Sequence, residues 1–201
     1  MAPLKKLILA SQSPRRKELL EALHIPFEVC PSDAEEYHPD GHEPSVIVIE
    51  NTVRKVNAVL NRCAGSLIIG ADTIVWLDNE TLAKPVDFKQ AREFLHRLSG
   101  TTHTVYTGVV VADSDSARAE SSVCATDVTF KQLSSADIDI YLRSINPYDK
   151  AGGYAIQGFG ALVVEKINGC YFNVMGLPVS MLDSLMHRFG VSLFDYISTE
   201  G

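Results

Sequence analysis

Apolar and polar residues alternate along the chain in runs whose length and period predict strands and helices in turn. Apolar runs of strand length are expected to form strands over Leu7–Ala10, Phe27–Cys30, Leu67–Leu77, Val105–Ala112, Ser122–Phe130, Ala161–Ile167 and Cys170–Val174. The run Leu67–Leu77 is the most apolar, so we expect it to be a central strand, interrupted where Asp72 and Thr73 occur.

Between these runs, apolar residues recur three or four positions apart, which predicts about five helices. They are expected to begin near Pro14, near Pro44, after Asp87, after Ser134 and after Pro178. Asp87 and Ser134 are expected to cap their helices, because short polar side chains accept hydrogen bonds from the first free amides. The second helix is expected to bury the stripe Val46, Ile49, Val53, Val56 and Leu60.

Strands and helices follow one another in mixed order, with turn signals inside two pairs of strands. Hairpins are expected across the polar segment Asp113–Glu120 and at Asn168-Gly169. This order predicts an α/β fold with a mixed β-sheet. No segment has the composition of a linker, so we expect residues 1–201 to form a single domain with two lobes around a central cleft.

Composition restricts the classes of function. The chain has 201 residues and a formal net charge of −7, and neither nucleic acid nor a membrane is an expected partner, because binding to either needs a basic face. The four cysteines are far apart, which predicts reduced thiols in a cytoplasmic protein and neither a zinc site nor disulfides. No apolar run has the length needed to cross a bilayer.

The segment Ser11–Arg16 joins the first strand to the first helix. Ser13 is the expected N-cap and Pro14 fits the first helical turn, so free amides are expected beside Arg15 and Arg16. Free amides and arginines at a helix start attract anions such as phosphate. A surface loop with two solvated arginines is the alternative.

Asp72 lies inside an apolar run, where a carboxylate is costly to bury unless it is paired, hydrogen-bonded or bound to a metal. The alternative is a structural cap at a strand break. Lys55 neighbours the apolar stripe of the second helix and either points along a cleft wall or is solvated. The glycine-rich segment Asp149–Gly160 indicates backbone close to a ligand or a plain turn.

Polar residues gather at the ends of the expected elements: Ser13, Arg15, Arg16, Glu36, Lys55, Asp72, Lys84, Asp149, Lys150 and Gln157. Carboxylates are the ligands of Mg²⁺ or Mn²⁺, and arginine and lysine bind phosphate. A polyphosphate substrate held with a divalent metal cation would use both kinds of side chain, despite the acidic net charge.

Several segments resemble the Maf family of nucleoside triphosphate pyrophosphatases. Ser11–Leu20 resembles the opening signature of the family, and the later motifs are matched in order by Gly70–Thr73, Lys84-Pro85, Asp149–Gly152 and Ile156–Gly158. The resemblance implies a two-lobed fold similar to that of inosine triphosphate pyrophosphatase (the Maf/Ham1 fold). It implies cleavage of a nucleoside triphosphate to a monophosphate and pyrophosphate, with a divalent metal, in a cytoplasmic protein that often forms a homodimer.

The resemblance also implies roles for single residues. Asp72 matches the proton acceptor, and Arg15, Thr73 and Gln157 match positions that mark the dTTP/UTP subfamily. The chemistry of the remaining residues agrees: Glu36, with or without Asp72, can hold the metal, while Ser13, Arg16, Lys55 and Lys84 can bind phosphates. The sequence leaves open whether Asp72 acts as base or metal ligand.

Gln157 suggests how the base is chosen. A glutamine amide can pair with O4 and N3–H of uracil or thymine, and in its flipped orientation with cytosine, so CTP and modified pyrimidine triphosphates stay open. A non-catalytic nucleotide-binding regulator of cell division or septum formation is the alternative function. The acids Glu36 and Asp72 favour an enzyme, because a pure binder needs no base beside a phosphate site.

Overall fold

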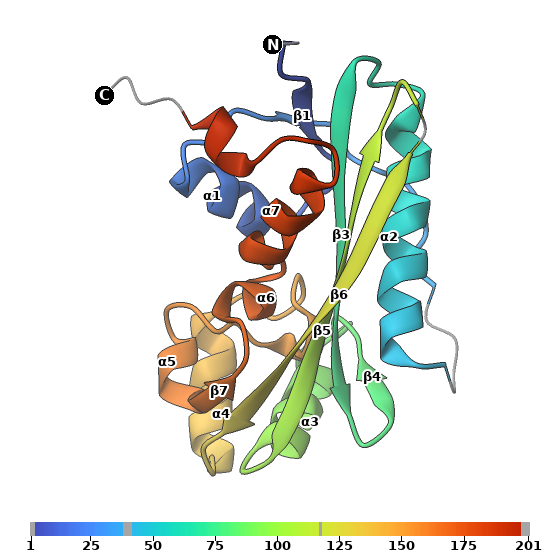
Figure 1. Ribbon diagram of the computed structural model, residues 1–201. Coiled ribbons are helices and arrows are strands. Elements are labelled where there is room, and N and C mark those ends of the chain that lie inside the picture. The colour runs from blue at the N-terminus through green and yellow to red at the C-terminus, as the bar shows by residue number, and fades with distance from the viewer. Residues whose placement is uncertain (1–2, 38–41, 117, 198–201) are drawn as a thin grey trace.

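A computed structural model describes residues 3–37, 42–116 and 118–197, and it contains one seven-stranded mixed sheet (Figure 1). The strands pair in the order β2-β1-β3-β5-β6-β7, with β4 on β3. The strands are β1 Lys6–Leu9, β2 Glu28–Val29, β3 Ser66–Leu77, β4 Glu80–Leu82, β5 Thr102–Asp113, β6 Ala119–Phe130 and β7 Val164–Asn168. The prediction of an α/β fold with a mixed sheet is confirmed.

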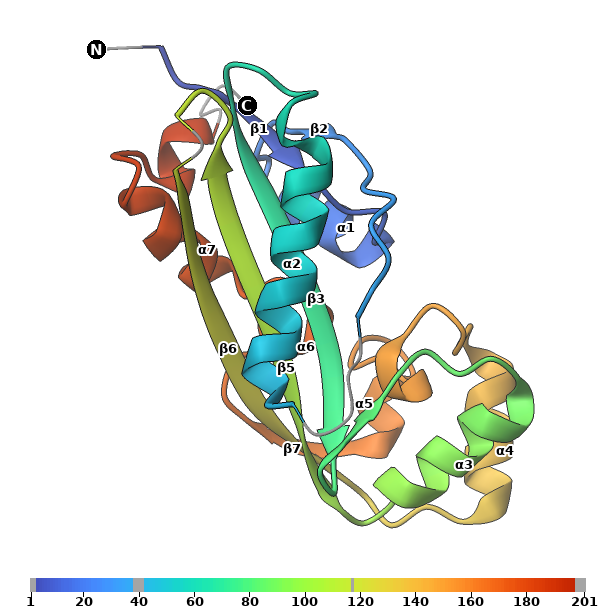
Figure 2. The ribbon, with the colours of Figure 1, turned by 90° about the vertical axis from the view of Figure 1, so that its right-hand side faces the viewer.

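Helix α2 covers one face of this sheet, and the other helices lie on the opposite face (Figures 1 and 2). The helices are α1 Pro14–Ala22, α2 Pro44–Leu60, α3 Phe88–Leu98, α4 Ser135–Ser144, α5 Gly160–Val163, α6 Tyr171–Met175 and α7 Val179–His187, with 3₁₀ turns η1 Ala151–Gly153 and η2 Leu193–Tyr196. The expected caps are present, because Asp87 accepts from the Gln90 amide and Ser134 forms a capping box with Asp137. Among the described residues, no helix has both the length and the apolar character that a bilayer span requires.

The helices on the shared face form two groups, each around its own apolar cluster (Figure 1). The first lobe consists of β1, α1, α7 and η2, which pack on Leu67, Ile69 and Ala71 of β3. The second lobe consists of α3, α4 and α5, which pack near Val75 and Leu77 of the same strand. The predicted two-lobed architecture is therefore present, and both lobes share β3.

Strand β3 is continuous, which contradicts the expected break at Asp72 and Thr73. Its pairing with β5 runs without a gap from Leu67–Asp113 to Trp76–Thr104. The opposite edge is different, because β1 pairs only as far as Ile69 and β4 begins to pair at Val75. Between Ile69 and Val75, this edge of β3 has no paired strand among the described residues, and Asp72 and Thr73 line the cavity there. Asp72 needs no strand break because its carboxylate is paired with side chains of α2.

The buried face of α2 is rotated from the predicted one. Val46 and Val53 are 49% and 37% exposed, while the buried face carries Asn51 and Thr52 among its apolar residues. The reason is close backbone contact with the sheet: a Cβ on Gly108 would lie 2.7 Å from the carbonyl oxygen of Val48. The buried face stays mainly apolar and includes Val56 of the predicted stripe, but it is turned so that Asn51 and Thr52 face the sheet.

The C-terminal region also differs from the prediction. The hairpin expected at Asn168-Gly169 is absent from the described residues: β7 pairs with β6, while the preceding residues form α5 and the following ones α6. Asn173 of α6 is buried and donates through Nδ2 to the Val105 carbonyl (2.9 Å) and to Thr126 Oγ1 (3.0 Å). These long-range bonds favour a helical turn over the local turn signal. The tail forms η2, whose Tyr196 packs in the first lobe.

Candidate active site

A cavity of about 480 Å³ lies between the two lobes, within the range of small-molecule sites. Its walls come from the start of α1, the segment after β2, α2, the open edge of β3 and the segment that contains η1. Every residue that the sequence singled out contributes to the lining: Ser13, Arg15, Arg16, Glu36, Lys55, Asp72, Thr73, Lys84, Asp149, Lys150 and Gln157. The fold therefore brings together side chains that are up to 144 positions apart — Ser13 and Gln157.

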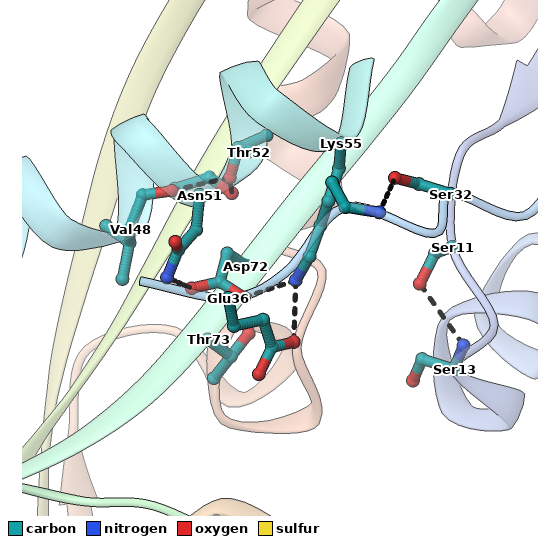
Figure 3. Close-up of polar contacts among 12 residues, drawn as sticks. Ser11, Ser13, Ser32, Glu36, Val48, Asn51, Thr52, Lys55, Asp72 and Thr73 are labelled. Atoms are coloured by element: carbon teal, nitrogen blue, oxygen red, sulfur yellow. Dashed lines mark hydrogen bonds and ion pairs between the residues drawn. The ribbon is translucent and has the colours of Figure 1, made fainter. Parts of the chain in front are cut away.

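A buried carboxylate with a lysine partner belongs to the cleft lining (Figure 3). Only 4% of the Asp72 side chain is exposed, and Lys55 Nζ lies 2.5 Å from its Oδ1. The same Nζ lies 2.8 Å from Glu36 Oε1, so one ammonium joins two acids that come from different elements. Lys55 thus points along the cleft wall and is not solvated, which decides between the two alternatives that the pattern left open.

Further cations line the same cleft. Lys84 Nζ is 3.6 Å from Glu36 Oε1, and its side chain is half exposed. Arg15 of α1 reaches across to the η1 segment, where its guanidinium lies 3.4 Å from Asp149 Oδ2 and donates to the Asp149 carbonyl oxygen. Lys150 donates to Asp149 Oδ1 at 2.6 Å. Arg15 and Asp149 therefore connect the two walls, and Arg15, Lys84 and Lys150 all line the same cavity.

Arg16 is held by the protein on every side-chain nitrogen. Its Nε donates to the Gly176 carbonyl (2.7 Å), one terminal nitrogen to Ser11 Oγ (3.0 Å) and the other to Thr73 Oγ1 (3.1 Å). Burial lowers the pKa of this guanidinium, while the negative charge of Asp72 acts in the opposite direction. The side chain keeps a fixed charge in the cleft wall, since a guanidinium stays protonated in proteins.

Thr73 and Asp72 lie on opposite faces of β3, as the alternation of a strand requires. The hydroxyl of Thr73 lies 2.9 Å from that of Thr107, which itself donates to the Asn173 carbonyl (3.2 Å). Through these bonds Thr73 ties Arg16 to β5 and α6. Thr107 was missed in the sequence because a threonine in a strand carries no signal of function.

The loops of the cleft are held in two ways. Ser13 is the N-cap residue of α1, but its side chain makes no capping bond; the Ser13 amide instead donates to Ser11 Oγ (3.2 Å). Opposite, Tyr154 anchors the glycine-rich segment because its hydroxyl lies 2.7 Å from Nε2 of the buried His103. Burial lowers the pKa of His103 to about 4 and raises that of Tyr154. Gln157 follows on the exposed part of this segment.

Asn51 of α2 is a second residue that the sequence did not reveal. It is 1% exposed, and its Nδ2 donates to Asp72 Oδ2 at 3.1 Å (Figure 3). The predicted phase of α2 hid this residue, because the stripe was placed on Val46 and Val53. Two adjacent polar residues, Asn51 and Thr52, in a helix that must cover a sheet are the signal that could have found it.

The donor set of the cleft fits a divalent cation that also binds a phosphorylated ligand. Among the described residues, no group of three or more histidine, cysteine, aspartate or glutamate side chains could hold a metal alone. The two carboxylates of Glu36 and Asp72 meet at one point, where Lys55 is their shared counter-charge. One or two carboxylates, with water and phosphate oxygens, suit Mg²⁺. Glu36 and Asp72 are therefore the residues that would hold such an ion.

The fold and the cleft define an α/β protein with a two-lobed ligand site of mixed charge. Residues 6–189 match the model of the family described as Maf-like protein. A dTTP/UTP pyrophosphatase of Bacillus cytotoxicus is 44% identical over 92% of this chain and 96% of its own length. One from Methanococcoides burtonii is 42% identical over 96% and 99%. The chain belongs to the Maf family.

A solved structure of a HAM1 protein from Coxiella burnetii is also similar. It covers 63% of this chain and 73% of its own, with a TM-score of 0.44 and 13% sequence identity. The assignment to the family rests on the sequence relatives.

Proposed function

We propose that this chain hydrolyses nucleoside triphosphates, dTTP and UTP in particular, to the monophosphate and pyrophosphate. The observation that carries the proposal is the buried Asp72 carboxylate, which faces the cleft between Lys55 and Asn51. The names of the relatives, at 42–44% identity over nearly the whole chain, supply the substrate class.

In the proposed reaction, water attacks the α-phosphorus and the bond between the α-phosphorus and the bridging oxygen breaks. Asp72 accepts the proton of the attacking water, and pyrophosphate leaves with the bridging oxygen. General-base help of this kind contributes about 10²–10⁴-fold. A bound divalent cation, Mg²⁺ or Mn²⁺, would supply positive charge to the phosphates; Glu36 is its proposed ligand, and Asp72, besides accepting the proton, is the proposed second ligand.

The cations of the cleft are proposed to bind the charge that builds up on the leaving group. Lys55, Lys84 and Arg16 line the cavity together with the start of α1 at Ser13. Electrostatic stabilisation and positioning dominate phosphoryl transfer. These cations are therefore expected to contribute to the rate without forming a covalent intermediate. Arg15 and Lys150 also line the cavity, where Asp149 pairs with both, and we assign these two cations to holding the triphosphate.

Gln157, with Arg15 and Thr73, is proposed to set the choice of base. Gln157 is exposed in the cleft wall on the segment that Tyr154 anchors, so its amide is available to the edge of a pyrimidine. A glutamine offers both a donor and an acceptor, as uracil and thymine require. We assign CTP and modified pyrimidine triphosphates as further candidate substrates, because the flipped amide fits cytosine.

One experiment tests the function and its alternative. The protein is incubated with Mg²⁺ or Mn²⁺ and a panel of ribo- and deoxyribonucleoside triphosphates, and the products are separated. We expect monophosphate plus pyrophosphate, fastest from dTTP and UTP. Binding without product would favour the non-catalytic regulator of cell division, and diphosphate plus phosphate would contradict the proposed bond cleavage.

We also propose that the protein works in the cytoplasm as a homodimer. The family resemblance supports this assignment, and the net charge of −7 argues against nucleic acid as a partner. Sedimentation at several concentrations would test it, and a monomer at micromolar concentration would contradict the dimer.

A further inference from the structure

Asn51 is a buried polar residue with three hydrogen bonds, and two segments of the cleft meet on it. Its Oδ1 accepts from the Tyr37 amide at 2.7 Å, and its Nδ2 donates to the Tyr37 carbonyl at 3.1 Å. The second hydrogen of Nδ2 points to Asp72 Oδ2, also at 3.1 Å. Both hydrogens of the amide nitrogen are used, so the side chain has one orientation that satisfies all three bonds.

The bonds to Tyr37 fix the segment that carries Glu36. Tyr37 follows Glu36 directly, and both its backbone groups are held by Asn51. The guanidinium of Arg54, one turn further along α2, lies 4.8 Å from the centre of the Tyr37 ring. The segment is therefore attached to α2 through its backbone and through its side chain. Glu36 reaches Lys55 from this attached position.

The bond to Asp72 fixes the second oxygen of that carboxylate. Lys55 binds Oδ1 and Asn51 binds Oδ2, so the plane of the carboxylate is determined from both sides (Figure 3). With Lys55 alone the carboxylate could rotate about its Cβ–Cγ bond, because a single contact to an ammonium does not define the plane. Rotation of this kind matters in a site that depends on geometry: a displacement of about 1 Å can cost about 10²-fold in rate.

We propose that Asn51 is a positioning residue for this enzyme, which sets the placement of Asp72 and of the Glu36 segment relative to each other. It does so from α2, without reaching the substrate itself. The inference rests on the proposed function of the cleft. A merely structural residue would stabilise the fold without influencing the chemical step, and the two roles are separable by experiment.

Two substitutions separate the contacts. Asn51→Asp keeps an acceptor for the Tyr37 amide but removes both hydrogens of Nδ2 and places a second negative charge beside Asp72. Asn51→Leu removes all three bonds in a side chain of similar size. Thr52→Val is the matched control, because Thr52 is equally buried on the same helix and, among the residues that the structure describes, its hydroxyl bonds to the carbonyls of Val48 and Gly108 and not to Asp72.

The measurements are kcat and KM with UTP, the Kd of a non-hydrolysable α,β-methylene analogue, and amide hydrogen exchange at Tyr37. We expect both Asn51 variants to lose kcat by about 10–100-fold. In Asn51→Leu, which adds no charge, the Kd of the analogue should change by less than about threefold. Thr52→Val should keep kcat within about twofold of the wild-type value, even if the midpoint of its thermal unfolding is lower. The Tyr37 amide exchanges faster in Asn51→Leu and keeps its protection in Asn51→Asp.

Several results would overturn the inference. A folded Asn51→Asp protein with kcat within about twofold of the wild type would show that the bond to Asp72 is not needed. Equal losses of kcat in Asn51→Leu and Thr52→Val would indicate a structural role. A wild-type protein that hydrolyses no nucleotide would refute the proposed function and, with it, the kinetic role of Asn51. Exchange at Tyr37 would then still decide whether Asn51 holds the Glu36 segment.

Discussion

At the scale of residues, the cleft consists of charges held in place by other side chains. Asp72 has a partner on each oxygen, and Arg16 has a partner on each nitrogen. Such pre-arranged charges need no reorganisation when a ligand arrives, which is the main source of electrostatic stabilisation in enzymes. Two substitutions of single residues test the two halves of the proposed function, the chemistry and the choice of base.

Replacement of Asp72 by asparagine is expected to abolish hydrolysis while the fold persists. The amide has the shape of the carboxylate but cannot accept the proton of water, so kcat for UTP should fall by about 10²–10⁴-fold. Lys55 keeps Glu36 as a partner, so circular dichroism should show the wild-type spectrum. Substantial turnover with metal present would remove Asp72 from the mechanism.

Replacement of Gln157 by glutamate is expected to remove most turnover of UTP and dTTP. The glutamate carboxylate can only accept hydrogen bonds, whereas O4 of uracil or thymine needs a donor. The substitution therefore leaves O4 without a hydrogen-bond partner. The loss should appear in kcat/KM and reach about 10-fold or more. Gln157→Asn, with a shorter amide of the same type, is the control; kinetics close to the wild type in Gln157→Glu would refute the role.

At this scale the charged residues of the cleft were easier to recognise in the sequence than Asn51 and Thr107. Asp72 was recognisable because a carboxylate in an apolar run is costly, and Arg15, Arg16 and Lys84 were recognisable at element ends. Asn51 and Thr107 were not, since a neutral amide or hydroxyl shows its importance only through partners that are distant in sequence.

At the scale of elements, long-range contacts decided where local patterns failed. Asp87 and Ser134 cap their helices as expected, because capping depends on residues within one turn. The phase of α2 could not be predicted, since it follows from Gly70 and Gly108 in other strands. The turn at Asn168-Gly169 was likewise outweighed by the bonds of Asn173.

His103 of β5 bonds to Tyr154 of the glycine-rich segment. Its protonation is expected to lower the free energy of unfolding in mildly acidic solution. His103 packs edge-to-face against both Phe130 and Tyr154, with ring centroids 5.2 and 5.3 Å away. Burial lowers the pKa of His103 from its ordinary value of 6.5 to about 4. Between these values the unfolded chain binds a proton that the folded chain refuses, so the free energy of unfolding falls as the pH falls.

The expected loss from this group is about 2 kcal/mol between pH 7 and pH 5. Urea unfolding at the two pH values would measure it, with His103→Gln as the control that keeps a hydrogen-bonding partner for Tyr154. The variant should lack this part of the pH dependence, although its stability at pH 7 falls. The same decrease in both proteins would assign the effect to other groups.

At the scale of the whole molecule, the two lobes are joined by shared strands and not by a linker. Residues of β3 belong to both apolar clusters, with Leu67 and Ile69 in the first and Val75 and Leu77 in the second. Strand β5 contributes to both clusters in the same way. The alternation of strands and helices was enough to predict the mixed sheet, but only the register of β1, β4 and β5 on β3 explains why the cleft opens beside Asp72.

Shared strands imply that the lobes unfold together. We expect one calorimetric transition, with its enthalpy equal to the van't Hoff value. The fluorescence of Trp76, on β3, should change at the same temperature as the far-ultraviolet circular dichroism of the helices. Two separate transitions would instead identify the lobes as independent folding units.

The continuous pairing of β3 and β5 also has a mechanical consequence. A hinge needs a few residues that absorb a large change in backbone dihedral angles, and a strand bonded to its neighbour over its whole length contains none. The span beneath the cleft is therefore stiff, and the distance between the walls is set when the sheet forms. Such a cleft limits the size of its ligand: side chains that line it can change conformation, but the paired strands β3 and β5 do not move apart for a larger ligand.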